Sequence, residues 1–176
     1  MEKQFNEYSL IRLFEKSKDE IINHITSLDD NDRYLRFGYL PKNSMINKYV
    51  NYTFSKINTE SNANFWFGVT QKNKLIATIH IAIYGDEAEF AFTTDKNHRG
   101  KKLGQLLFSR GYQLITEFGI NRIKLTCLSQ NNVMKHIASK FGLKFTYSSG
   151  EVDAVTYIQY PVTIQQVNEL KKSAMN

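Results

Sequence analysis

The residues best placed for chemistry lie between Ala88 and Gln105, in the stretch AEFAFTTDKNHRGKKLGQ. A strand pattern there runs into Arg99, a glycine and two lysines, and a helix pattern begins close to Gly104. The first amides of a helix have no intrahelical acceptors, and the helix dipole adds positive charge at the same place. Glycine lets the backbone approach a ligand closely, and basic side chains raise the local potential. The stretch therefore predicts a diphosphate site.

A solvated basic loop that caps an ordinary helix could carry the same residues. The context favours the anion site, because a strand pattern precedes the loop, an amphipathic helix follows, and a further strand returns. A Walker-type loop is excluded, since the Gly-Lys-Ser/Thr ending is missing. A Rossmann dinucleotide site is not expected either, because the strands before the loop are predicted to be antiparallel.

The elements around the loop follow from periodicity. Strand patterns at residues 65–70, 75–84 and 88–94 are joined by short, turn-rich segments, which predicts an antiparallel meander. Apolar residues at helical spacing predict a helix over 102–118, and an apolar run predicts a buried strand over 122–128. Since strand, helix and strand form a crossover, strands 88–94 and 122–128 should be parallel.

The remaining patterns predict flanking helices and further strands. They are a strand at 8–14, a helix behind the capping-box pattern Ser17 to Glu20, a helix with a buried stripe from Met45 to Ile57, a helix at 132–141, and a hairpin formed by 143–147 and 152–160. We expect one domain over residues 1–176. The pattern leaves open whether the tail, 161–176, forms a docked helix.

Two motifs carry a family resemblance. Arg99 and Gly104 match the pattern Gln/Arg-x-x-Gly-x-Gly/Ala, with Lys102 in place of the middle glycine. Asn131 is followed by a helix pattern and then by Lys-Phe-Gly-Leu at 140–143, similar to an Asn-to-Gly-Phe segment. In these motifs and in the order of elements the chain resembles the GCN5-related N-acetyltransferase (GNAT) family.

This resemblance implies an α+β fold with a mixed, mostly antiparallel sheet, flanked by helices and splayed in a V between its fourth and fifth strands. It also implies acetyl-CoA as co-substrate and no metal, with the pantetheine arm in the splay. The cofactor-binding residues implied are Phe92, Thr93 and Thr94 for the arm, Arg99, Gly100, Lys101, Lys102, Leu103, Gly104 and Gln105 for the phosphates, and Asn131 near the thioester.

Acetyl transfer needs a neutral amine, whereas a lysine-like amine is almost wholly protonated at pH 7. The segment AEFA resembles the position of the acidic base in protein-acetylating bacterial members of the family, which implies Glu89 as the catalytic base. Strand alternation by itself leaves its direction open, and Glu87 is the alternative. Many members place a tyrosine acid where this chain has Ala138. His136, Tyr147 and Ser139 are candidates for that role, and none is assigned.

The segment Arg33 to Phe37, RYLRF, resembles a stretch in bacterial protein-lysine acetyltransferases, where the region forms one wall of the acceptor site. Alternatively, it is a helix in which Leu35 and Phe37 pack while Arg33 and Arg36 pair with carboxylates.

Composition narrows the possible partners. The 23 Lys and Arg against 17 Asp and Glu give a formal charge of +6, which favours anionic partners. Nucleic acid is not expected, because no recognition motif accompanies the charge. Cys127, the single cysteine, excludes an intramolecular disulfide and is predicted to be buried, and the four histidines are too scattered for a metal cluster. The start lacks a signal-peptide pattern and no apolar run could span a bilayer, so we predict a cytoplasmic protein without a membrane partner.

The sequence thus predicts an N-acetyltransferase that moves the acetyl group of acetyl-CoA directly to a primary amine, either a protein lysine or a small-molecule amine. A non-catalytic coenzyme A-binding sensor or interaction module is the alternative, motivated by Lys102 and Ala138. The oligomeric state, monomer or homodimer, is left open.

Overall fold

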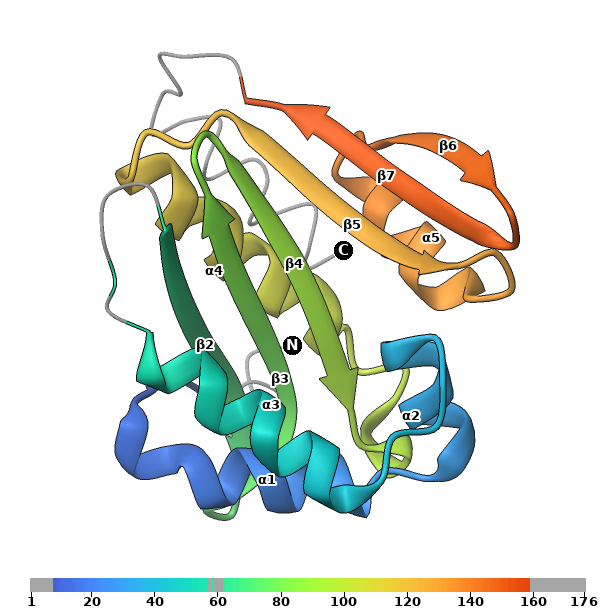
Figure 1. The fold of residues 1–176 in the computed structure, drawn as a ribbon. Coiled ribbons are helices and arrows are strands. Elements are labelled where there is room, and N and C mark those ends of the chain that lie inside the picture. The colour runs from blue at the N-terminus through green and yellow to red at the C-terminus, as the bar shows by residue number, and fades with distance from the viewer. Residues whose placement is uncertain (1–7, 57, 59–61, 159–176) are drawn as a thin grey trace, which may run out of the picture.

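A computed structural model describes residues 8–56, 58 and 62–158 (Figure 1). Seven strands form one sheet in the order β1-β2-β3-β4-β5-β7-β6. The strands are β1 Tyr8–Leu13, β2 Asn62–Gln71, β3 Lys74–Tyr84, β4 Glu87–Thr94, β5 Arg122–Leu128, β6 Lys144–Ser148 and β7 Glu151–Tyr157. The helices are α1 Lys18–Ser27, α2 Asp30–Phe37, α3 Asn43–Ser55, α4 Leu103–Glu117 and α5 Asn132–Lys140.

All neighbouring strands are antiparallel except β4 and β5, so the predicted meander and the predicted parallel pair are both confirmed. The turn between β2 and β3 uses Lys72 and Asn73 in the left-handed conformation, which matches the twist of a two-residue hairpin. Strand β7 lies between β5 and β6, so the last hairpin extends the sheet beyond β5.

Helices cover both faces of the sheet (Figure 1). Helix α4 packs on one face, where Gly111 allows a close approach: a Cβ atom added there would lie 2.9 Å from the ring of Phe90. Helices α1 and α3 cover the other face through a second apolar cluster that includes Ile21, Val50 and Trp66. The indole of Trp66 donates to Thr53 Oγ1 at 3.0 Å and is 2% exposed, so Trp66 belongs to the core.

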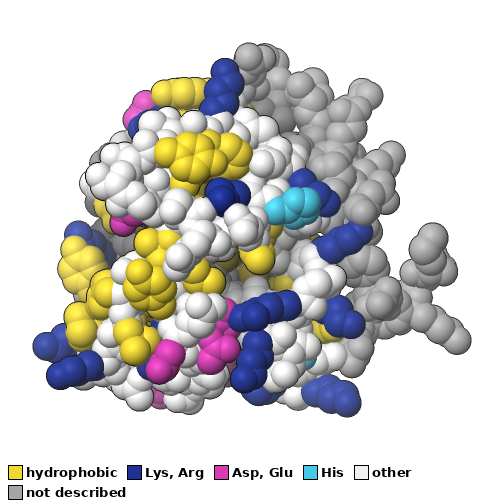
Figure 2. All heavy atoms as spheres, turned by 90° about the vertical axis from the view of Figure 1, so that its right-hand side faces the viewer, with side chains coloured by type: hydrophobic (Ala, Val, Ile, Leu, Met, Phe, Trp, Pro, Cys, Tyr) yellow, Lys and Arg dark blue, Asp and Glu magenta, His cyan; other side chains and the backbone are white. Residues whose placement is uncertain are grey.

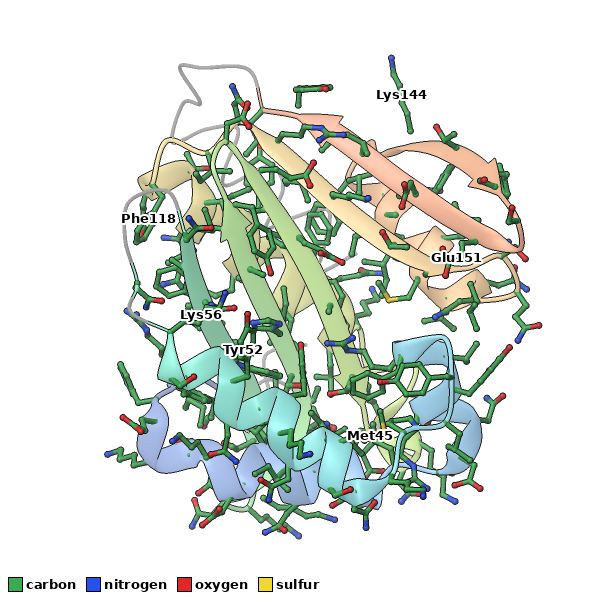
Figure 3. The ribbon with its side chains drawn as sticks, in the orientation of Figure 1. Met45, Tyr52, Lys56, Phe118, Lys144 and Glu151 are labelled. Carbon is green, nitrogen blue, oxygen red and sulfur yellow. The ribbon has the colours of Figure 1, made fainter. Side chains whose placement is uncertain are left out.

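Local details differ from the sequence predictions. Met45, labelled in Figure 3, is 44% exposed at the start of α3, because the buried face of that helix is formed by Ile46, Val50 and Thr53 and Met45 lies outside it. Ser17 makes no side-chain cap, since a 3₁₀ turn runs directly into α1. The helix that carries RYLRF begins earlier, at Asp30, and Asp29 caps α2 by accepting from the Asp32 amide at 2.9 Å.

Helix α2 contains no fully buried residue. Ile57 and the tail at 161–176 lie outside the described residues. No described helix combines the length and the apolar character that crossing a membrane requires.

Candidate active site

The sheet opens between β4 and β5. Their parallel ladder covers only Glu87 to Glu89, which pair with residues 122–124, whereas β5 pairs with β7 along its whole length. An ion pair between Glu87 and Arg122 joins β4 and β5 at the end where the two strands are still paired. Beyond Glu89 the edge of β4 faces a cavity, so the predicted splay between the fourth and fifth strands is confirmed.

The cavity has a volume of about 900 Å³. Its walls come from α2, the open edge of β4, the loop at 98–104, β5 and α5. Figure 2 shows the face with α2, α5 and the β6–β7 hairpin, on which hydrophobic side chains lie mainly on the left and at the top of the view and Lys and Arg side chains are most numerous on the right. Glu151, labelled in Figure 3 at the start of β7, also lines the cavity.

The loop before α4 forms one end of the cavity, which we call the cofactor end. Gly100 and Lys102 both adopt left-handed backbone, with φ of 72° and 59°. Lys102 is the N-cap residue of α4, and its left-handed backbone is one that glycine adopts more readily than other residues. Gly104 lies against α5: a Cβ atom added there would be 2.7 Å from Ile137 Cδ1.

The cationic side chains of this loop are not equivalent. Arg99 reaches across the cavity to form an ion pair with Asp32 of α2, and both residues line the cavity. Lys102 also lines it, whereas Lys101 is not among the lining residues. The predicted set is thus brought together on one wall apart from Lys101, whose neighbours line the cavity on both sides.

At Phe92 and Thr93, strand β4 offers its backbone, rather than its side chains, to the cavity. Phe92 turns toward α4 and stacks on Phe108 with ring centroids 6.1 Å apart. Thr93 turns the other way and hydrogen-bonds His24 Nε2 at 2.9 Å and Thr78 Oγ1 at 2.6 Å. Because the strand has no ladder partner on the β5 side here, the main-chain groups on that side can pair with the amides of an extended ligand.

Asn131 occupies the opposite wall. It is buried, and its Oδ1 accepts from the Met134 amide at 3.1 Å, which caps α5. Cys127, which lines the same cavity from β5, is a buried free thiol, as predicted, and burial raises its pKa. Of the three candidates for a proton donor, His136 lines the cavity, and Ser139 and Tyr147 are absent from the lining set of the described residues.

Glu89 lies on the cavity at the point where β4 and β5 part. It is half-buried and lines the cavity, whereas Glu87 is held in the ion pair with Arg122 and does not line it. The structure therefore distinguishes Glu89 from Glu87, because only Glu89 lines the cavity, whereas strand alternation alone could not choose between them. We call this region, with α2 beside it, the acceptor end of the cavity.

A hydrogen-bonded chain supports the acceptor end. Arg36 donates to the Tyr49 hydroxyl at 2.8 Å, this hydroxyl lies 2.6 Å from His80 Nδ1, and His80 Nε2 lies 3.0 Å from Asn64 Oδ1. His80 also stacks on Trp66, with centroids 4.5 Å apart. Sequence reasoning missed this chain, because its members come from four elements and each fits an ordinary core or surface pattern.

Burial fixes the protonation of the chain. It lowers the pKa of His80 to about 3, with the charge of Arg36 acting in the same direction, so the ring is neutral near pH 7. Burial also raises the pKa of the Tyr49 hydroxyl, Glu89 adds to this rise, and Arg36 opposes it. Since Asn64 Oδ1 only accepts, His80 carries its proton on Nε2 and Tyr49 donates to Nδ1.

Comparison with known proteins decides the family. Residues 20–143 match the sequence profile of the Acetyltransferase (GNAT) family. The chain belongs to this family. It is therefore an acyl-CoA-dependent N-acetyltransferase with acetyl-CoA as its co-substrate.

Solved structures share the fold at low identity. The GNAT domain of S. lividans PAT superposes with a TM-score of 0.73 at 19% identity, over 85% of this chain and 89% of that one. The PaiA N-acetyltransferase from Thermoplasma acidophilum in complex with coenzyme A gives 0.63 at 17%, over 86% and 99%. Spermidine N-acetyltransferase from Vibrio cholerae, in complex with CoA and spermine, gives 0.64 at 17%, over 87% and 95%. No curated protein sequence matches the chain significantly.

The residues present fit coenzyme A. The loop before α4 combines left-handed turns with Arg99 and Lys102, which suits a diphosphate, and the open β4 edge suits an amide-bearing arm. Within the described residues there is no group of three or more His, Cys, Asp or Glu side chains that could hold a metal ion.

Proposed function

We propose that this GNAT acetyltransferase moves the acetyl group directly from acetyl-CoA to a primary amine, with Glu89 as the base. The observation that carries the proposal is the position of Glu89 on the cavity, where the β4–β5 ladder ends. A thioester bound along the open β4 edge would bring its carbonyl carbon toward this carboxylate. The thioester supplies the activated acetyl group.

Glu89 takes a proton from the acceptor ammonium, directly or through water, and leaves a neutral nitrogen. The nitrogen forms the new C–N bond as the C–S bond breaks, the sulfur leaves as thiolate, and the nitrogen releases its second proton to solvent to become the amide. His136 is the cavity-lining side chain among the three candidates that could return a proton to the sulfur, and solvent is the other source. The acceptor is a protein lysine or a small-molecule amine.

Calorimetric titration with acetyl-CoA, paired with release of free thiol on a panel of primary amines, tests the proposal. We expect saturable binding together with amine-dependent thiol release. Binding without release on any amine would instead favour a coenzyme A-binding module. Two residues motivate this alternative: Lys102, which replaces the middle glycine of the loop pattern, and Ala138, which stands where many members have a tyrosine acid. Absence of binding would overturn both functions.

A further inference from the structure

The two arginines of α2 have different surroundings. Arg33 forms an ion pair with Asp30 and donates to Asn43 Oδ1 at 3.3 Å, as the packing interpretation of RYLRF predicted. Arg36 lines the cavity and has no carboxylate partner within the part of the chain that the structure describes. A half-buried guanidinium without a carboxylate, turned to a cavity, is a binding group for an anion.

Arg36 is also held in place. Its guanidinium lies over the ring of Phe37 at 4.8 Å and over that of Tyr49 at 5.5 Å, and it donates to the Tyr49 hydroxyl. That hydroxyl is in turn fixed by the neutral ring of His80, stacked beneath it on Trp66. A donor whose orientation is set before binding loses little entropy when it binds.

The cavity places a negative group near this cation. Glu89 lines the same cavity and acts electrostatically on the Tyr49 hydroxyl, to which Arg36 is bonded. The two charges are nevertheless not ion-paired with each other among the described contacts. Opposite charges that line one cavity without pairing with each other are complementary to a ligand that carries an amine and an anion.

We propose that the acceptor is a primary amine that also carries a carboxylate, with Arg36 as the residue that binds this carboxylate. Tyr49 and His80 are positioning residues that orient the guanidinium. This inference rests on the proposed function, because it places the amine at Glu89. A second ammonium group beside Arg36 would be repelled, so polyamines are disfavoured.

The carboxylate could belong to a free amino acid or to an acidic residue next to a lysine in a peptide. Matched amines of similar basicity separate these sources: ε-aminocaproate against its amide, and the blocked dipeptides Lys-Glu against Lys-Gln, with spermidine as a third arm. We expect at least about a tenfold higher kcat/KM for one carboxylate over its amide, because a charge-assisted hydrogen bond is lost with the amide.

Arg36→Gln should abolish this preference by raising KM for the carboxylate, with little change for the amide. Arg33→Gln, on the same helix but outside the cavity, is the matched control and should keep the preference. Arg36→Lys should restore part of it, and Tyr49→Phe, which keeps the ring but loses the hydroxyl, should lower the ratio to an intermediate value. Melting temperatures show that each variant is folded.

Equal use of the carboxylates and their amides, or a preference for spermidine, would overturn the inference while leaving the acetyltransferase function intact. Failure to turn over any amine would contradict the proposed function instead. In that case, calorimetric binding of ε-aminocaproate and of its amide to the coenzyme A-saturated protein decides the inference separately. Binding of the carboxylate alone supports it, and no difference between the two overturns it.

Discussion

The two ends of the cavity are built differently. The cofactor end is formed by consecutive residues, from the open edge of β4 through the loop to the first turn of α4, and works through backbone groups and left-handed turns. The acceptor end is lined by side chains such as Glu89 and Arg36, and hydrogen-bonded side chains of α3, β2 and β3 support Arg36 from outside the cavity lining. Main-chain recognition suits a co-substrate that every family member shares, whereas side-chain recognition can distinguish one acceptor from another.

A buried neutral histidine lies behind each end of the cavity, so low pH should lower the folding stability at both ends. Burial lowers the pKa of His24, beneath Thr93, to about 4, and that of His80, beneath Tyr49, to about 3, against 6.5 for the ordinary side chain. As pH falls below 6.5 the unfolded chain takes up these protons and the folded chain does not, so stability is present above pH 6.5 and falls below it. The slope should be on the order of 1 kcal/mol per pH unit for each histidine.

Denaturant unfolding between pH 7 and 4.5 measures this loss, which should total several kcal/mol. His24→Gln and His80→Gln should each remove about half of the dependence of the unfolding free energy on pH. The two variants therefore measure how much each end of the cavity contributes to it. The exposed His136 provides the control, because His136→Asn should keep the full slope. A free energy of unfolding that stays constant over this range would contradict the buried neutral rings.

Glu89→Gln tests whether chemistry belongs to the acceptor end alone. The amide keeps the size of the side chain but cannot take a proton, so we expect kcat to fall about 100-fold or more. Coenzyme A affinity, measured by calorimetry, should change by less than about twofold, because the cofactor end is untouched. Glu87→Gln, on the same strand but outside the cavity, should retain turnover. A Glu89→Gln enzyme with normal kcat would remove this carboxylate from the mechanism.

Gly104→Val tests the cofactor end in the same way. The new Cβ would lie 2.7 Å from Ile137 Cδ1, so either the Ile137 side chain must turn away or α4 and α5 must move apart where the loop meets the cavity. We expect about 1–3 kcal/mol of lost stability, together with at least about a tenfold loss of coenzyme A affinity. In folded protein saturated with acetyl-CoA, the preference between acceptors should not change; a changed preference would show that the two ends are not separable.

Lys102→Gly has the smallest expected effect. Lys102 already has the left-handed backbone, so glycine should relieve strain and change stability by about 1 kcal/mol or less. Since the backbone path stays the same, the change in coenzyme A affinity reports the side-chain charge. We expect weaker binding with a shallower salt dependence. Tighter binding would show instead that the lysine side chain obstructs the cofactor.

The contrast between the ends also explains what the sequence could predict. The strand, loop and helix around Gly104 are local, and their spacing predicted the elements, the parallel pair and, through the family resemblance, the splay. The resemblance implies Lys101 as a phosphate-binding residue together with its neighbours, and the sequence alone does not tell which of these loop side chains line the cavity. Tyr49 looked like one more member of an apolar stripe, and only the register of β2 against β3 brings Asn64 and His80 to it.

The absence of any fully buried residue in α2 has an evolutionary consequence. The helix that presents Arg36 to the acceptor contributes little to the packed interior, so substitutions along it cost little folding stability. Mutations there can alter which amine is accepted while each mutant protein still folds. Acceptor range in this lineage can therefore drift by ordinary point mutation while the scaffold stays unchanged.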